Sequence, residues 1–146
     1  MLRSVLLIFA AALALPAWSA DPIAASVKTV QGKCVIHRGT ETIPVQEGMH
    51  LLVSDVVETP GDGRVGIIFQ DGTRISAGPG TEVKIESFVY EPVDGKFGLL
   101  LRLARGVLAY VSGKIAQFSP GSVTVQTPAG IVGLRGTHFA ITTEGT

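Results

Sequence analysis

The sequence contains a single cysteine, Cys34, and this excludes an internal disulfide bond. Cys34 does not lie at the end of the N-terminal apolar run, so it is not placed as a lipid-anchor site. Free cysteine behaves as a small hydrophobic residue. We therefore expect Cys34 to be an ordinary strand residue and not a reactive thiol.

Charge is also scarce. Charged residues make up 16% of the 146 residues, and 12 basic and 12 acidic side chains give a formal net charge of zero. Nucleic-acid-binding proteins usually carry a basic patch or stripe, and this composition does not indicate one. Hydrophobic residues reach 46%, which is typical of a globular chain and not of a disordered one. The length favours one domain.

No apolar segment is long enough to span a membrane. The run from Val5 to Leu15 falls short of the roughly 20 residues that a spanning helix needs. Arg3 precedes this run and small residues follow it, which is the pattern of a bacterial secretory signal peptide. We predict that residues 1–20 are a signal peptide and that the rest of the chain is periplasmic or secreted.

The cleavage point stays open between two positions. Ala17 and Ser19 satisfy the small-residue rule for cleavage after Ser19. Cleavage after Ala20 would leave Trp18 three residues before the cut, which fits the rule less well.

Eighteen glycines and eight prolines favour many short strands joined by turns. The clearest signal is the stretch from residue 57 to 85, where apolar residues alternate with other residues as in half-buried strands. We predict an all-β domain over residues 27–146, preceded by a short leader at residues 21–26. The pattern leaves a solenoid-like and a roll- or sandwich-like arrangement open.

The turn at residues 70–72 decides the register of the central hairpin. A two-residue Asp71-Gly72 turn would place Arg74 opposite Phe69. A three-residue loop with Gly72 in the left-handed region pairs Phe69 with Thr73 and keeps the apolar residues on one face. We prefer the second register because a one-residue slip would turn the apolar side chains outward.

Further strands are expected on both sides of this hairpin. We expect Pro44 to mark an edge or the end of its strand. A last strand after Gly136 should close the domain. The expected strands cover residues 27–30, 33–37, 41–45, 49–53, 56–59, 65–69, 73–77, 81–85 and 123–127.

The segment 97–115 allows two interpretations. An amphipathic helix would use the leucines with Arg102 and Arg105, but glycines bracket only about two turns, which is marginal for a helix. We prefer two strands separated by an Ala104-Arg105-Gly106 turn. The side chains expected to point inward are Leu99, Leu101 and Leu103, then Val107, Ala109 and Val111.

From Val27 to Ile141 the chain resembles the FecR domain family. The order and spacing of several short motifs together carry the resemblance. They are Gly32 to Val35, Glu47-Gly48, residues 54–59, the strand 65–69 with Asp71-Gly72-Thr73, residues 78–83, Arg105-Gly106-Val107, Thr127-Pro128 and Gly136-Thr137-x-Phe139.

The resemblance implies a periplasmic all-β domain. In the iron-citrate sensor that gives the family its name, this domain helps to pass a signal from an outer-membrane transporter to a cytoplasmic sigma-factor regulator. This sequence is more similar to stand-alone secreted members. The resemblance therefore implies the domain identity, and it does not imply the transmembrane signalling role.

We expect no catalytic, cofactor-binding or metal-binding residues. His37, His50 and His138 lie far apart and lack the spacing of metal ligands. Asp55, Asp62 and Asp71 lie beside turn residues, where aspartate bonds the local backbone. Arginine could form a small basic patch, but a solvated face is the simpler interpretation. The arginines concerned are Arg102, Arg105 and Arg135.

Two functional hypotheses follow. The first is a non-catalytic binding, scaffold or signalling-accessory module that contacts a protein or an envelope polymer, with an open strand edge available for strand addition. The second is an envelope hydrolase or metal-dependent enzyme, which would need a cluster such as His50, Asp55 and Glu58. We prefer the first. The sequence does not identify the ligand or the oligomeric state.

Overall fold

The computed structural model describes residues 14–15, 22–136 and 138–144. The predicted signal peptide, apart from residues 14 and 15, lies outside the described residues. Within them, no helix is long and apolar enough to cross a membrane. The elements are β1 (Ile23–Gln31), β2 (Val35–Arg38), β3 (Glu41–Pro44), β4 (His50–Leu52), β5 (Val56–Thr59), β6 (Arg64–Phe69), β7 (Arg74–Ala77), β8 (Thr81–Glu91), β9 (Lys96–Val111), α1 (Lys114–Phe118), β10 (Val123–Thr127), β11 (Gly130–Gly133) and β12 (His138–Thr143).

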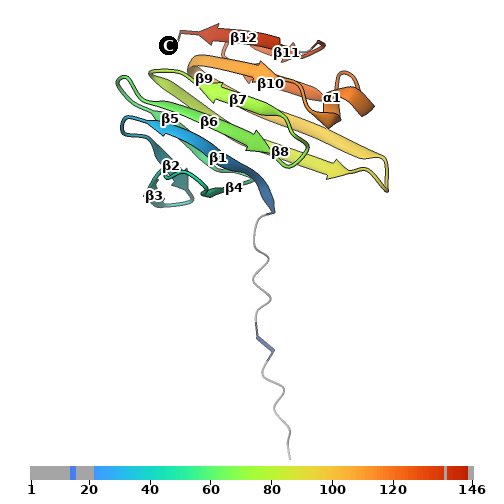
Figure 1. The fold of residues 1–146 in the computed structure, drawn as a ribbon, viewed down its shortest axis with the longest axis horizontal. Helices are drawn as coiled ribbons and strands as arrows, with labels where there is room; N and C mark the ends of the chain where they lie inside the picture. The colour runs from blue at the N-terminus through green and yellow to red at the C-terminus, as the bar shows by residue number, and fades with distance from the viewer. Residues whose placement is uncertain (1–13, 16–21, 137, 145–146) are drawn as a thin grey trace, which may run out of the picture.

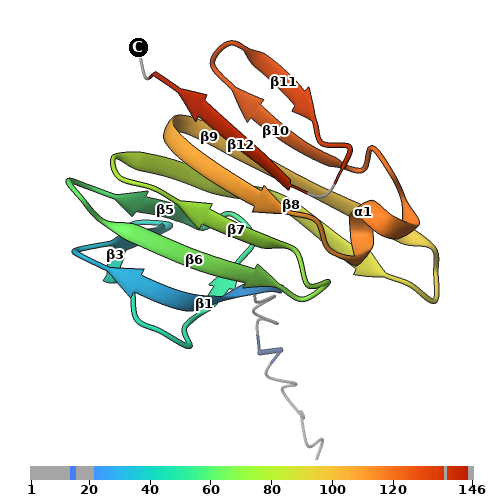
Figure 2. The ribbon, with the colours of Figure 1, turned by 45° about the horizontal axis from the view of Figure 1, so that its top comes forward.

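The strands form one curled sheet with two layers, which confirms the all-β prediction (Figures 1 and 2). The first layer, sheet A, contains β4, β1, β6, β7, the second part of β9, and β12. The second layer, sheet B, contains β3, β2, β5, β8, the first part of β9, β10 and β11. Among the pairs in the described residues, β10 with β9 is parallel and the others are antiparallel.

The two layers enclose the hydrophobic core between their inner faces. The rings of Phe69 in sheet A and Phe88 in sheet B lie 5.5 Å apart. Inward side chains of both layers are almost fully buried, among them Ile67 and Ile75 in sheet A and Ile85 and Leu101 in sheet B. Burying such side chains contributes about 1.5–3 kcal/mol each, so this interior is the main source of stability.

Strand β9 joins the two layers, and here the prediction of two strands with a turn was wrong. Residues 96–105 pair with β8 and residues 108–111 pair with β7, in one continuous strand. The register shifts between Leu103 and Arg105, so Ala104 is an extra residue in the ladder. Such a β-bulge bends a strand and increases its twist.

The bulge also reverses the predicted orientation of the side chains that follow it. Leu99, Leu101 and Leu103 point inward as expected, but Val107 is 38% exposed and Leu108 and Tyr110 are buried in its place. One extra residue shifts a period of two by one step. The other two residues predicted to point inward, Ala109 and Val111, are exposed and half-buried.

Gly106 allows the bend to form. Its φ is +99°, and a side-chain carbon there would overlap Thr81 of β8. The Thr81 hydroxyl donates to the Val107 carbonyl at 3.1 Å and accepts from the Val107 N–H at 3.0 Å. These two bonds fasten the corner of β9 to the start of β8.

The β6–β7 hairpin has the predicted three-residue loop. Val65 lies opposite Ala77 and Ile67 opposite Ile75. The Phe69 N–H donates to the Thr73 carbonyl at 2.8 Å, and Gly72 has φ of +87°. The loop chemistry therefore predicted the register correctly.

Other elements also differ from the predictions. The expected leader at residues 21–26 is part of β1 from Ile23 onward, and Ala24 and Ala25 are buried. β8 continues to Glu91, beyond the expected end at residue 85. Helix α1 was not predicted, and it occupies part of the segment 97–115 that was expected to be strand. Pro44 ends β3, which is an edge strand as predicted.

Candidate functional site

The proposed enzyme-like set of His50, Asp55 and Glu58 is divided among separate partners. His50 Nδ1 lies 3.3 Å from the Ser26 hydroxyl. Glu58 Oε2 lies 2.7 Å from His37 Nε2. Within the described part of the chain, no group of three or more histidine, cysteine, aspartate or glutamate side chains is arranged to hold a metal ion.

Asp55 is a structural anchor. Its carboxylate is 1% exposed and accepts bonds from Arg38 Nε at 2.9 Å, Arg38 Nη2 at 2.7 Å and the Leu52 N–H at 2.8 Å. The hydrogen bond to Asp55 raises the pKa of Arg38. A buried carboxylate that is satisfied in this way connects β2 to the turn before β5.

Asp71 has a similar role in the β6–β7 loop. It is buried and accepts bonds from the Thr73 N–H at 3.1 Å, the Thr73 hydroxyl at 2.7 Å and the Ile115 N–H at 3.0 Å. The first two bonds are the local turn bonds that aspartate favours. The third attaches α1 to the β6–β7 loop, and nothing in the sequence spacing indicated it.

The three arginines considered as a basic patch have different environments. Arg105 contacts Glu58 at 3.2 Å and Glu82 at 3.1 Å, and Arg102 contacts Glu86 at 3.2 Å. Arg135 lies instead at a cavity of about 670 Å³ beside α1. The paired arginines belong to an alternating charged face on sheet B, so they do not form a free basic surface.

Cys34 is buried, as expected of a small hydrophobic residue. Burial raises the pKa of the Cys34 thiol, which disfavours the reactive thiolate. The thiol donates a weak hydrogen bond to the Gln31 carbonyl at 3.4 Å. The residue itself lies just before β2, outside the strand.

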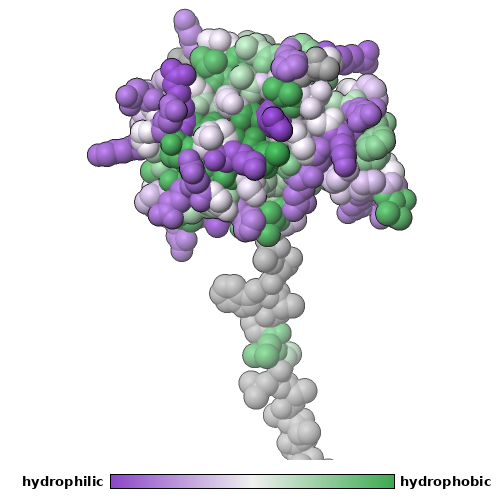
Figure 3. Space-filling model, in the orientation of Figure 1, coloured by the Kyte–Doolittle hydropathy of each residue, from purple (hydrophilic) through white to green (hydrophobic). Residues whose placement is uncertain are grey.

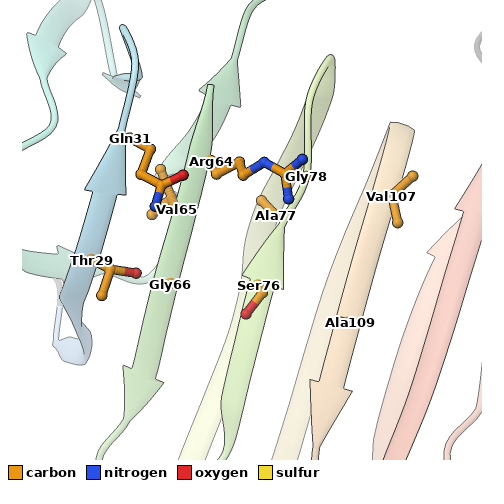
Figure 4. A pocket seen from close by; sticks show the side chains of 10 residues that line it. All are labelled: Thr29, Gln31, Arg64, Val65, Gly66, Ser76, Ala77, Gly78, Val107 and Ala109. Atoms are coloured by element: carbon orange, nitrogen blue, oxygen red, sulfur yellow. The ribbon is translucent and has the colours of Figure 1, made fainter. Parts of the chain in front are cut away.

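A shallow groove of about 380 Å³ crosses the outer face of sheet A (Figure 4). Thr29, Gly66, Ser76 and Ala109 form one row across β1, β6, β7 and β9. A side-chain carbon at Gly66 would overlap the Thr29 hydroxyl, so the packing of β1 on β6 explains this glycine. Figure 3 shows exposed apolar residues between polar ones on the face toward the viewer, without a continuous apolar patch.

The strand edges differ in how well they are protected. β3 carries Glu41 and Pro44, and β4 has three residues. Charges, proline and short length all discourage pairing with another chain. β11 has none of the charges or prolines: all four of its residues are exposed, with Ile131 at 68% and Val132 at 39%. Figure 2 shows β11 at the outer side of the β10–β11 hairpin.

The backbone of β11 has unused hydrogen-bonding groups. The Leu134 N–H donates to the Val123 carbonyl at 3.0 Å, so residues 134 and 123 form a hydrogen-bonded pair. Hydrogen-bonded and non-hydrogen-bonded pairs alternate along an antiparallel ladder. Val132 therefore bonds toward Val125, and the N–H and C=O groups of Ile131 and Gly133 point away from β10.

The two faces of β11 both offer apolar contacts. Ile131 lies opposite Gln126 on the outer face, beside a cavity of about 350 Å³ that Arg102, Ala104 and Pro128 also line. Val132 lies opposite the buried Val125 on the inner face. A strand added at this edge would therefore find bonding groups in its plane and apolar side chains above and below it.

Among known protein families, the family model described as FecR protein matches residues 55–146, which is more than half of the chain. No curated protein and no solved structure matches the sequence significantly.

Proposed function

Because the chain belongs to the FecR family, whose domains are related to signalling, we propose that it is a non-catalytic accessory module of the bacterial cell envelope. In this proposal it works by binding an extended segment of a partner protein along β11. The observation that carries the proposal is the open edge of β11, which bears exposed Ile131 and Val132 and no charged residue.

The edge favours a protein segment over an envelope polymer of sugars. An extended peptide can match the backbone groups of Ile131 and Gly133 with its own N–H and C=O groups at the regular spacing of a strand. It can also place alternate side chains against Ile131 on one face and Val132 on the other. Main-chain bonds supply affinity in this binding mode, and side-chain contacts supply specificity.

The charged network on sheet B supports a structural role for the ionisable residues. Glu58 and Glu82 both pair with Arg105 on the outer face, and Asp55 and Asp71 are buried with their bonds satisfied. These groups hold the strands together, so the proposal places binding at the β11 edge and not at an ionisable site. Export to the periplasm, which the N-terminal pattern of the sequence predicts, would bring this edge into contact with envelope proteins.

The test is capture of a partner from envelope extract by the immobilised protein and by two variants. Ile131→Lys places a charge on the open edge, where charge blocks strand pairing. Thr142→Lys places the same charge at an exposed position of β12, an edge strand of sheet A. We expect a protein that wild type and Thr142→Lys capture and that Ile131→Lys loses by at least tenfold.

Mapping the captured segment completes the experiment. A photo-reactive side chain at residue 131 should cross-link to an extended stretch with apolar residues at alternate positions. Equal capture by wild type and Ile131→Lys, or cross-links that fall elsewhere, would reject β11 as the binding edge. Thermal melting of both variants checks that the substitutions leave the fold intact.

A further inference from the structure

We infer that the open edge of β11 accepts a second copy of this chain, in a two-fold antiparallel pair centred on Val132. This inference rests on the proposed role of β11 as a pairing edge and names one partner for it. Three features of β11 favour this pairing: the register that its free backbone groups impose, the distribution of its side chains, and its lack of charge.

The backbone fixes the register. The outward groups of β11 belong to Ile131 and Gly133, as the bond from the Leu134 N–H to the Val123 carbonyl requires. Two antiparallel copies that use these groups pair Ile131 with Gly133 of the other copy, and Gly133 with its Ile131. Val132 then lies opposite Val132 on the two-fold axis, which is the isologous arrangement of a symmetric dimer.

The side chains are complementary in this register. On the outer face, each exposed Ile131 lies next to a glycine of the other copy, which leaves room for the isoleucine. On the inner face, the two Val132 side chains meet in a non-hydrogen-bonded pair, where side chains approach most closely. Both contacts remove apolar surface from water, since Ile131 is 68% exposed and Val132 is 39% exposed.

The monomer gives no reason for a glycine at position 133. A side-chain carbon there would meet no atom within 4 Å, and its backbone is not in the left-handed region. Gly106 and Gly113, in contrast, are each required by close neighbours, namely Thr81 and Thr73. The open space above Gly133 is the space that Ile131 of a second copy would occupy.

Charge does not oppose this pairing. Strands β10 and β11 contain no charged residue. Arg135 follows two residues after β11, and in the proposed register it lies opposite Ala129 of the other copy. Like charges directly opposite one another would destabilise a strand pair, and none meet here.

The first experiment is disulfide trapping in a Cys34→Ser background, which removes the native thiol. The Cα atoms of a non-hydrogen-bonded pair are about 4.5 Å apart, within the range that a disulfide bridges. Val132→Cys should therefore form a covalent dimer under mild oxidation. Ile131→Cys is the matched control. In the proposed register, residue 131 lies opposite residue 133 of the other copy, so the two cysteines are two strand positions apart. This variant should cross-link at least tenfold less.

The second experiment measures self-association without cysteines, by analytical ultracentrifugation of the wild type over a concentration series. Gly133→Val should weaken the dimer at least tenfold, because the valine would occupy the place of Ile131 of the other copy. Its melting temperature should match that of wild type at dilutions where both are monomeric. This comparison separates a lost contact from a damaged fold.

Several outcomes would overturn the inference. They are a wild type that stays monomeric at high concentration, equal trapping of the two cysteine variants, and a dimer that Gly133→Val leaves unchanged. If the wild type is monomeric, but captures a partner protein that Ile131→Lys does not capture, the second copy is rejected and the proposed function is kept. A Val132-centred dimer that captures no other protein would confirm the inference and reject the foreign partner.

Discussion

Two hairpins of the molecule have the same plan and different surroundings. Both β6–β7 and β10–β11 are antiparallel pairs with short loops. The β6–β7 hairpin has β1 on one side and β9 on the other, whereas β10–β11 has β9 on one side and solvent on the other. We call β6–β7 the inner hairpin and β10–β11 the outer hairpin. Ile67 in the inner hairpin is 2% exposed, and Ile131 in the outer hairpin is 68% exposed.

This difference shows how the same residue type acquires different roles. In the inner hairpin, the inward apolar side chains are buried and both strands are paired on both sides, so they contribute to stability. In the outer hairpin, β10 is used in this way, since Val123 and Val125 are fully buried, but β11 is not. In the proposed function, contact with a partner depends on the strand that contributes least to the core. Four predictions test the comparison, from the largest expected effect on stability to the smallest.

The largest effect is expected where the inner hairpin meets the end of β9. A side-chain carbon at Gly113 would overlap the backbone nitrogen and the hydroxyl of Thr73. Gly113→Ala should lower the free energy of unfolding by about 3 kcal/mol or more, because backbone atoms would have to move. Gly133→Ala in the outer hairpin should change it by less than about 0.5 kcal/mol. Chemical denaturation of both variants makes the comparison.

Similar losses in the two glycine variants would contradict this prediction. They would mean that the outer hairpin is as tightly packed as the inner one. The denaturation should be measured at protein concentrations low enough to exclude any effect of self-association on Gly133→Ala.

The second prediction concerns Tyr110, which lies opposite Ile75 of the inner hairpin. It is 1% exposed, and burial, with a smaller contribution from the charge of Asp71, raises its pKa from 10.0 to about 12. The folded state therefore holds this proton more tightly than the unfolded state does. The stabilisation that this raised pKa contributes is fully present below pH 10, and it is lost as the pH rises through about 12.

The loss should reach about 2.7 kcal/mol, since each pKa unit corresponds to about 1.4 kcal/mol. The Tyr110 hydroxyl has no hydrogen-bond partner among the described residues. Tyr110→Phe should therefore be at least as stable as wild type at neutral pH and should lose this part of the alkaline decline. Melting curves from pH 8 to 12 measure both effects. An identical alkaline decline in Tyr110→Phe would assign the titration to another group.

The third prediction concerns the loop of the inner hairpin. Gly72 has φ of +87°, and the space around it is open, so strain and not crowding opposes a side chain there. Gly72→Val should cost roughly 1 to 3 kcal/mol. Gly72→Asn is the matched variant, because asparagine tolerates the left-handed region better than valine does. An unchanged melting temperature in Gly72→Val would contradict the turn geometry.

Gly72 also shows how much of the fold the sequence predicts. The loop and its register followed from local information, namely the alternation of the strands and the residues able to adopt positive φ. The edge position of Pro44 followed from the missing N–H of proline. These features depend on neighbours that are close in the sequence, and the structure confirmed them.

The features that the sequence analysis missed depend on distant neighbours. The bulge at Ala104 is fixed by Thr81, and α1 is held by Asp71, which lies 44 residues from Ile115. The exposure of Ile131 depends on which strands lie beside β10, and this is a property of the whole topology. The open edge had been expected in general terms, but its location on β11 required the structure.

The smallest effect on stability is expected for Ile131→Ala, and the matched variant is Ile67→Ala. Truncation of the buried Ile67 should cost about 2–5 kcal/mol, through lost transfer energy and the cavity it leaves. Truncation of Ile131 should cost less than about 0.5 kcal/mol, since most of its side chain already contacts water in the monomer. Denaturation at high dilution measures both values. In a second series at high protein concentration, the loss of stability in Ile131→Ala should grow with concentration, whereas the loss in Ile67→Ala should not. The reason is that a paired edge stabilises the folded state by mass action. A loss of 2 kcal/mol or more for Ile131→Ala at high dilution would show that other parts of the chain cover this edge. β11 would then be a covered strand, like those of the inner hairpin, and not a binding surface.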